Sequence, residues 1–517
     1  MDRAAALAEQ GMVSALWAEQ RPDKMALHFS GGDRTFGELH ERANRLADVF
    51  RKCGLQPGDG VAIICGNGPV FVESYLAAMR SGLRLTPVNW RLAPAEAAYI
   101  VENCDARALI AKGKSKDSAL ACAPAPLVLR LMAGGSAEGF ADYETALSAA
   151  SAADPAAPEH GTLMLYTSGT TGRPKGVYKR APEPVLPQGP GTYAAYDPEH
   201  DVALCCGPAY HAAPLLMDVR WPLASGVPVV MMEKFDPEDA LRLIAQHRVT
   251  HTHMVPTMFQ RLLQLPQAVR DRYDVSSLKM VIHGAAPCPV ETKRAMIEWL
   301  GPVLTEYYAA TEGSGGFVIT SDEWLRKPGS VGRLDPSFGA RVLDESGTPC
   351  PPGAVGKVYL RAEPGARFSY YKDPQKTDGL FEGDHFTLGD MGYLDEDGYL
   401  FLTGRTAELI ISGGVNIYPQ EIDNVVGLHP AVADVCTIGA PNDEWGEEVR
   451  SVVELRAGVS PSPELAEEIL AFVRERLSGY KRPRAIDFAA ELPRLASGKI
   501  QRAAVRAPYW QGRRISI

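Results

Sequence analysis

The feature that most restricts the fold is a regular alternation of helix and strand patterns near the N-terminus. Residues 35–54 predict an amphipathic helix, because Thr35 opens a capping-box pattern and apolar side chains then recur on one face. Residues 60–66 form an apolar run typical of a buried strand, 70–82 predict a second helix, and 83–89 predict another strand. Because strand, helix and strand at this spacing are typical of a parallel βαβ unit, the sequence predicts an α/β fold.

The length and the C-terminal pattern predict more than one domain. The chain has 517 residues, which exceeds what one hydrophobic core normally supports. After residue 409 the pattern changes: residues 418–428 are helical in pattern, 431–440 and 450–458 are strand-like, and Ser462 caps another helix. We therefore expect a compact α+β module of roughly a hundred residues at the C-terminal end.

The composition excludes several classes of function. Lys plus Arg number 53 and Asp plus Glu number 63, so the formal net charge is -10 and nonspecific binding of nucleic acid or anionic membranes is not expected. The nine cysteines show no CxxC spacing, which argues against a disulfide framework or zinc site and favours reduced thiols. Since neither a signal-peptide core nor an apolar run long enough to span a bilayer occurs, we expect a cytoplasmic protein without a transmembrane segment.

A glycine-rich loop at residues 166–176, YTSGTTGRPKG, is the first candidate site. Its glycines allow main-chain N–H groups to approach a ligand closely, and its hydroxyl and cationic side chains add donors and charge. Such a loop suits a polyanion such as phosphate, although the order of a Walker loop does not occur. The alternative is a flexible surface linker, which would not need two cations around a proline. The apolar run upstream predicts that the loop leaves a strand.

Four further segments complete a set of five motifs: EYYAATEG at 306–313, TLGDMGYLDEDGYLFLTGR at 387–405, GRTAELIISGGVNIYPQEID at 404–423 and LPRLASGKIQR at 492–502. Together with the loop they resemble the adenylate-forming superfamily of acyl-CoA synthetases, firefly luciferase and nonribosomal adenylation domains. The resemblance covers nearly the whole chain. It implies a large N-terminal domain, 1–407, of βαβ subdomains plus a distorted β-barrel, and a small C-terminal α+β domain, 408–517, that rotates.

The resemblance implies a nucleotide site. Tyr308 is expected to stack on adenine, Asp390 to accept from the ribose hydroxyls and Arg405 to contact ribose or phosphate. Lys499 takes the position of the catalytic lysine, which contacts the substrate carboxylate and the α-phosphate as charge develops. Taken alone, an aspartate in a hairpin turn or a lysine near a chain end is more often structural or simply solvated.

Further residues take phosphate and metal roles by the same resemblance. Thr311 is expected to contact phosphate, and Glu312 with Thr167 to hold Mg²⁺, a cation that prefers oxygen ligands. A lone Thr-Glu pair would otherwise indicate only a polar turn. The other residues expected to bind the nucleotide are Ser168, Gly169, Thr170, Thr171 and Lys175 in the loop, with Gly284 and Ala285.

Coenzyme A and hinge residues are also implied by the resemblance. Glu408 is the hinge candidate and follows Ala407, where relatives usually have lysine. Glycine backbone in the SGG turn would allow close approach of pantetheine. Trp445 and Tyr480 would contact coenzyme A, with aromatic core packing as the alternative role for both. The residues expected to contact coenzyme A are Ser412, Gly413, Gly414, Trp445 and Tyr480.

The acid-binding pocket is the least determined part of the site. His211 matches a position at the gate of the acyl pocket in the family, with a core histidine as the alternative. Ala309 and Ser369 stand where the family usually has glycine, and we hypothesise that Ala309 reshapes the pocket. The small residues of 283–289 and 313–316 predict room for a medium-chain or bulky acid. The two histidines of HTHMVP lack a further ligand cluster, so this segment predicts a strand rather than a metal site.

The resemblance implies an ATP-dependent acid–CoA ligase that forms an acyl-adenylate and then an acyl-CoA, releasing pyrophosphate and AMP. ATP, Mg²⁺ and coenzyme A are the expected cofactors, and a medium-chain or bulky alicyclic or steroid-type carboxylic acid, as in fatty acid metabolism, is the expected partner. Aryl acids and a carrier-protein-loading enzyme are alternatives, as are a luciferase-like oxygenase and a noncatalytic nucleotide-binding module. A homodimer is left open.

Overall fold

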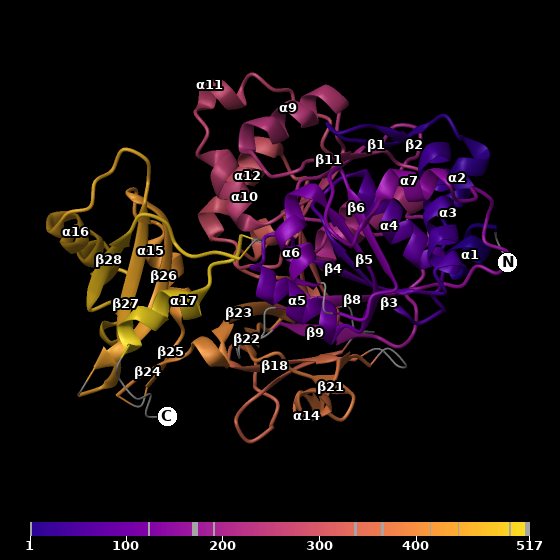
Figure 1. The fold of residues 1–517 in the computed structure, drawn as a ribbon. Coiled ribbons are helices and arrows are strands. Elements are labelled where there is room, and N and C mark those ends of the chain that lie inside the picture. Colours follow the sequence, from indigo (N-terminus) through magenta and orange to yellow (C-terminus); the bar gives the residue numbers. More distant parts are fainter. Residues whose placement is uncertain are drawn as a thin grey trace.

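The computed structural model describes residues 3–122, 125–167, 174–189, 192–334, 339–362, 367–413, 415–442, 444–495 and 498–511. Figure 1 shows a large body and, beside it, a smaller unit made of the C-terminal elements in yellow and gold. The fold is α/β with this two-part organisation, as the sequence predicts. None of the helices in the described part of the chain is both long and apolar enough to cross a membrane.

The first sheet of the large body is mainly parallel and is covered by helices on both faces. Val61 and Ile63 on β3 belong to a core shared with α3, α4 and α7, while the alternate residues Ala62 and Ile64 belong to one shared with α5 and α6. The strands, in sheet order, are β19 (Ser369–Tyr370), β9 (Lys175–Tyr178), β8 (Thr162–Thr167), β4 (Arg84–Val88), β3 (Gly60–Ile64), β5 (Ala106–Lys112), β6 (Leu129–Ala133) and β7 (Ala141–Asp142). The helices are α3 (Phe36–Lys52), α4 (Pro69–Arg80), α5 (Pro94–Asn103), α6 (Lys116–Ala121) and α7 (Tyr143–Ser148).

The predicted N-terminal βαβ unit is confirmed. The Thr35 hydroxyl accepts from Glu38 N (3.2 Å) and Glu38 Oε2 accepts from Thr35 N (2.8 Å), so both halves of the capping box form at the start of α3. Strands β3 and β4 then pair in parallel, with α4 as the crossover. The predicted strand before the glycine-rich loop is β8, which ends at Thr167.

The second sheet begins as a parallel sheet and continues as antiparallel strands. Phe317, Phe368 and Phe386 form the centre of a separate core beneath the antiparallel part. The parallel strands are β1 (Met25–His28), β11 (Val229–Met231), β10 (Ala203–Cys205), β12 (His251–Met254), β13 (Met280–His283) and β14 (Leu304–Ala310). The antiparallel strands are β2 (Arg34–Thr35), β15 (Gly313–Thr320), β16 (Gly332–Leu334), β17 (Ala340–Leu343), β18 (Gly356–Arg361), β20 (Phe381–Glu382), β21 (His385–Phe386), β22 (Asp390–Leu394) and β23 (Tyr399–Arg405).

The helices around the second sheet include one π-helical segment. It spans Pro214–Arg220 and continues into the short helix α8, Trp221–Ala224. Such segments occur often at functional sites. The remaining helices of the large body are α1 (Arg3–Glu9), α2 (Ala15–Gln20), α9 (Pro237–His247), α10 (Pro256–Leu263), α11 (Gln267–Arg270), α12 (Val290–Leu300), α13 (Ser321–Arg326) and α14 (Pro374–Asp378).

The C-terminal unit has its own sheet and its own hydrophobic core. A 3₁₀ turn, Thr406–Glu408, joins the last strand of the large body to β24, and aliphatic residues from β24 to β28 form the core with α15 and α16. The predicted strands at 431–440 and 450–458 are confirmed as an antiparallel pair, β26 and β27. The elements are β24 (Ile410–Ser412), β25 (Val415–Ile417), α15 (Pro419–Val426), β26 (Val432–Asn442), β27 (Gly446–Leu455), α16 (Pro463–Arg474), β28 (Ala485–Ala489) and α17 (Arg502–Arg506).

Candidate active site

A cavity of about 760 Å³ lies where the C-terminal unit meets the large body. Its wall contains the carboxyl ends of β8, β12 and β14, the position where α/β sheets usually bind ligands. The C-terminal unit contributes the turn around Lys499. The residues singled out in the sequence that line it are Thr167, Lys175, His211, Ala285, Tyr308, Ala309, Thr311, Glu312, Asp390, Arg405, Glu408 and Lys499.

Other predicted site residues lie elsewhere. Gly284 is behind the wall, where a Cβ would lie 2.6 Å from the Tyr307 carbonyl oxygen, so only glycine fits. Gly313 packs on Phe386 and is not among the residues that line the cavity, so this residue does not provide the room expected for the acid; the side chains of 314–316 lie outside the described part of the chain. Ser168, Gly169, Thr170, Thr171 and Gly414 lie outside the described residues.

A hairpin and a neighbouring strand bring together the residues expected at the nucleoside. In the β22–β23 hairpin Asp390 lies opposite Arg405, and Arg405 Nε donates to Asp390 Oδ1 at 2.8 Å. From β14 the Tyr308 hydroxyl donates to Asp390 Oδ2 at 2.7 Å. Burial raises the pKa of Tyr308 above its usual range, so the phenol stays protonated. The group therefore offers an aromatic ring beside a carboxylate that can accept hydrogen bonds from a diol.

Cationic and carboxylate groups meet where β8 ends and β9 begins. Thr167 and Lys175 face each other across these two strands, so both ends of the glycine-rich loop are held together. Lys175 Nζ lies 4.7 Å from the centre of the Tyr370 ring, and the Tyr370 hydroxyl donates to Glu312 Oε1 at 3.1 Å. Burial and the neighbouring Lys376 lower the pKa of Lys175 to about 8. Two ammonium groups held side by side favour a polyanion between them.

The residues at this end fit a hard divalent cation only in part. Glu312 and Thr167 supply oxygen atoms, which Mg²⁺ prefers. Burial raises the pKa of the Glu312 carboxyl, a penalty that a bound cation would remove. The described residues contain no cluster of three or more His, Cys, Asp or Glu side chains able to hold a metal by themselves. A Mg²⁺ ion at Glu312 would thus take its other ligands from phosphate and water, as this ion commonly does.

A tight turn carries Lys499 into the cavity. Leu495 N donates to Lys499 O at 2.8 Å, and Gly498 has φ +85°, a conformation that favours glycine. The Thr257 hydroxyl at the start of α10 donates to Gly498 O at 3.1 Å and ties the turn to the large body. Burial, and then the nearby Arg405, lower the pKa of the Lys499 ammonium. Lys499 is consequently a poorly solvated cation on the cavity wall, a position that would suit an anionic ligand.

Beside Lys499 a buried arginine connects the inter-domain turn to the C-terminal core. Arg502 Nη2 lies 2.8 Å from Asp423 Oδ2, and its Nε lies 3.2 Å from Glu408 Oε2. The same guanidinium donates to the Thr437 carbonyl oxygen. Sequence reasoning did not single out Arg502, since its partners are 65 to 94 residues distant along the chain.

The residues expected at coenzyme A lie on the C-terminal unit and are not part of the cavity wall. Trp445 is 49% exposed and Tyr480 is 51% exposed. Gly413 N donates to Trp445 O, and a Cβ on Gly413 would lie 2.5 Å from the Trp445 ring. Ser412 pairs with Gly446 on β27. These side chains are accessible, but this arrangement of the two units does not bring them to Lys499.

Two polar side chains on the cavity wall were not identified from the sequence as site residues. His253 Nε2 lies 3.1 Å from the Tyr307 hydroxyl, and both residues line the cavity. The prediction that HTHMVP forms a strand is confirmed by β12, but its location beside the cavity could not be read from that pattern. Burial lowers the pKa of His253 and of the predicted gate residue His211 to about 4, so both imidazoles are neutral at pH 7.

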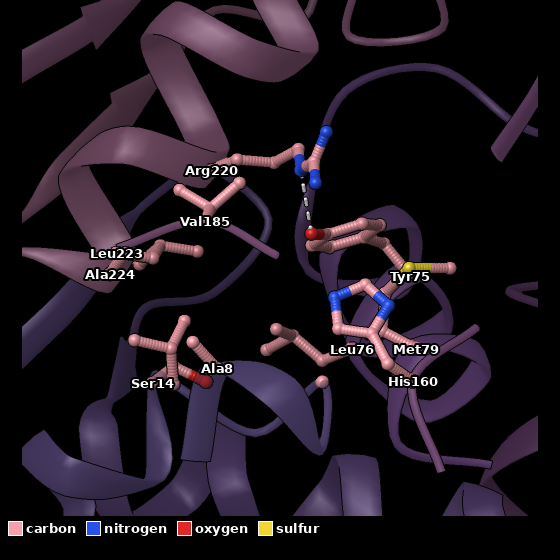
Figure 2. Close-up of a pocket in the computed structure, with 12 residues that line it drawn as sticks. Ala8, Ser14, Tyr75, Leu76, Met79, His160, Val185, Arg220, Leu223 and Ala224 are labelled. Atoms are coloured by element: carbon pink, nitrogen blue, oxygen red, sulfur yellow. Dashed lines mark hydrogen bonds between the residues drawn. The ribbon is translucent and has the colours of Figure 1, made fainter. Parts of the chain in front are cut away.

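A second, much smaller cavity lies between the N-terminal helices and α8. Arg220 Nε donates to the Tyr75 hydroxyl at 2.9 Å, the dashed line in Figure 2, and His160 and Ser14 also line this cavity. The cavity holds about 20 Å³, which is room for a water molecule rather than a metabolite. It is therefore not a candidate active site.

Comparison with known proteins identifies the family. The model of the AMP-binding enzyme family matches residues 15–370, and the model of its C-terminal domain matches residues 421–499. The chain belongs to this family. The resemblance to adenylate-forming enzymes is thereby confirmed.

Relatives of the chain share most of its length. It is 32% identical to indoleacetate–CoA ligase from Aromatoleum aromaticum, over 94% of this chain and 95% of that one. It is 33% identical to feruloyl-CoA synthase from an Amycolatopsis species, over 95% and 97%. The solved structure of a benzoate CoA ligase from Burkholderia xenovorans has a TM-score of 0.84 at 25% identity and covers 98% of this chain and all of its own (100%).

Proposed function

We propose that this AMP-binding enzyme is an ATP-dependent acid–CoA ligase. The observation that carries the proposal is the meeting of Lys499 from one unit with Asp390 and Glu312 from the other around one cavity. A noncatalytic nucleotide-binding module would not need a desolvated lysine tied into the cavity by a turn from a second unit. The names of the relatives, which are ligases of acids to coenzyme A, support the same reaction.

In the proposed first half-reaction a carboxylate oxygen of the acid attacks the α-phosphorus of ATP, and pyrophosphate leaves. Asp390 and Tyr308 hold the nucleoside, and Lys175 attracts the β- and γ-phosphates. Lys499 contacts the acid carboxylate and the α-phosphate and stabilises the charge that develops between them. Mg²⁺ held by Glu312 and Thr167 would neutralise phosphate charge.

In the proposed second half-reaction the thiol of coenzyme A loses its proton, attacks the acyl carbon and displaces AMP. We propose that residues 408–517 rotate about Glu408, withdraw Lys499 and bring the surface around Ser412 to Gly414, Trp445 and Tyr480 to the cavity. The exposure of Trp445 and Tyr480 supports this, because large aromatic side chains left at the surface often mark a binding site. Rotation must break the Thr257–Gly498 hydrogen bond, a small cost.

We infer that the acid is larger than acetate, since the cavity has room beyond a nucleotide. Bulky alicyclic or medium-chain acids fit the small residues of 285–289, and the named relatives favour aryl acids. All nine cysteines are free, which agrees with our proposal of a reducing, cytoplasmic location.

The experiment that tests the function measures pyrophosphate release with MgATP and a panel of short, medium, alicyclic and aryl acids, with and without coenzyme A. Release that becomes steady turnover to AMP and acyl-CoA when coenzyme A is added supports the ligase. If pyrophosphate is released but steady turnover needs a carrier protein, the acyl acceptor is that carrier protein and not coenzyme A. ATP binding without release for any acid would refute the enzymatic proposal.

A further inference from the structure

One part of the cavity wall has a distinctive composition. We call it the acyl wall; it consists of the lining residues from 207–217, 253–264 and 285–292. The inference drawn from it rests on the proposed ligase function. The acyl wall consists of small, aliphatic and aromatic residues together with uncharged polar groups. None of the lining residues in these described segments is Lys, Arg, Asp or Glu. Glu306, which lines the cavity next to it, is held by the buried Lys293 at 2.6 Å. A second charged group on the acid would therefore find no counter-ion here.

A pair of hydrogen-bonded polar groups, His253 on the acyl wall and Tyr307 beside it, faces the same cavity. Tyr307 from β14 places its hydroxyl 3.1 Å from His253 Nε2, with the rings 5.8 Å apart. A tyrosine hydroxyl has one donor and two acceptor positions, so this single bond leaves capacity for a ligand. Behind the pair, Asp218 of the π-helix accepts from His253 N at 2.8 Å and fixes the strand that carries the imidazole.

Burial changes the titration of both groups behind and within the pair. It raises the pKa of Asp218 well above that of an exposed aspartate. Burial also lowers the pKa of His253 to about 4, so the imidazole is neutral at pH 7. Asp218 Oδ2 and the Tyr193 hydroxyl are buried without a hydrogen-bond partner among the described residues, although neither residue lines the cavity itself. Unsatisfied buried polar atoms of this kind are uncommon, and a bound polar group or water is a usual explanation.

We propose that the Tyr307 hydroxyl, oriented by His253, binds an uncharged hydrogen-bonding substituent of the substrate, so that the enzyme acts on hydroxylated or keto-substituted ring acids. Tyr307 is the contact residue and His253 the positioning residue. A plain alkyl chain leaves the buried pair unused, and a dicarboxylate or sulfonate brings a charge into a wall without a cation.

The test uses matched acids that differ in one substituent: cinnamic, 4-hydroxycinnamic and 4-carboxycinnamic acid, with decanoic acid and cyclohexanecarboxylic and 4-hydroxycyclohexanecarboxylic acids as further probes. The kcat/KM for pyrophosphate release is measured for each. We expect at least roughly tenfold preference for the hydroxylated member of a pair over the unsubstituted one, and the weakest activity with the carboxylated acid.

Variants assign the preference to the pair. Tyr307→Phe should reduce the hydroxyl preference to near one, because activity on the hydroxylated acid should fall much more than activity on the unsubstituted acid. His253→Gln, which keeps a hydrogen-bonding side chain, should retain part of the preference. Tyr273→Phe removes a hydroxyl that bonds Glu238 outside the cavity and should leave the ratio unchanged.

Each outcome is decisive. Preference for decanoic acid, for the carboxylated acid or for the unsubstituted rings overturns the inference while the ligase proposal stands, as does an equal loss on both members of a pair in Tyr307→Phe. Absence of pyrophosphate release with every acid, despite ATP binding, instead refutes the proposed function on which the inference rests.

Discussion

Replacing Arg502 with Met should loosen the C-terminal unit, because it removes the partner of a buried carboxylate. Asp423 is 7% exposed, and its carboxylate accepts hydrogen bonds from Arg502 Nη2 at 2.8 Å and Thr437 N at 2.6 Å. Breaking a buried ion pair by removal of one member typically costs 3–5 kcal/mol. Since the Thr437 donor remains, we expect about 3 kcal/mol. The half-exposed contact of Arg502 with Glu408 adds less than about 1 kcal/mol.

The measurement is amide hydrogen exchange in β26, which reports local stability without requiring the whole chain to unfold in one step. A loss of about 3 kcal/mol corresponds to exchange on the order of 100-fold faster. The loss should shrink as the pH falls towards the pKa of an unfolded aspartate. Burial already raises the pKa of Asp423, and removal of Arg502 raises it further, so protonation relieves the unpaired charge.

A matched control uses the ion pair of Glu421, which lies on α15, the same helix as Asp423. Lys481 pairs with Glu421 at 2.7 Å, but both side chains are partly exposed, so Lys481→Met should change exchange less than about fivefold. The double variant Arg502→Met, Asp423→Asn should recover much of the lost protection, because no charge is then left unpaired. Exchange in β26 that is unchanged in Arg502→Met, or equal to that of the control, would refute this reasoning.

Three further perturbations test other parts of the structure. Lys499→Ala should slow acyl-adenylate formation on the order of 100- to 1000-fold while coenzyme A still reacts with added acyl-adenylate; loss of both half-reactions to the same extent would contradict separate roles for the two steps. The kcat/KM for ATP should fall as the pH rises through about 8, because Lys175 then loses the charge that attracts phosphate. Lys376→Met should move this decrease to higher pH, and an unmoved decrease would exclude Lys376 as a cause of the lowered pKa of Lys175. Thr35→Ala should lower the free energy of unfolding by about 1 kcal/mol in denaturant titration, and Thr35→Ser should stay close to the parent. An unchanged value in Thr35→Ala would show that the capping box contributes nothing.

Local patterns determined the elements whose formation depends on neighbours in the chain. The capping box at Thr35, the apolar run of β3 and the alternation that follows it were sufficient for the βαβ unit, because helix caps and buried strands depend on residues a few positions apart. The five motifs were sufficient for the family and for part of the cavity wall, including Glu312, Asp390 and Lys499, since each motif has a fixed place in this fold.

Only the tertiary structure decided how distant segments meet. His253 and Tyr307 are 54 residues apart, and Arg502 is 79 residues from Asp423, so no periodicity or spacing relates them. The sheet order places the first pair beside the cavity, and the packing of α17 against β26 places the second at the inter-domain turn. Gly313, which was expected near the acid pocket, packs on Phe386 instead for the same reason. Composition indicates small residues, but the surface that they face depends on strand register, which long-range pairing sets.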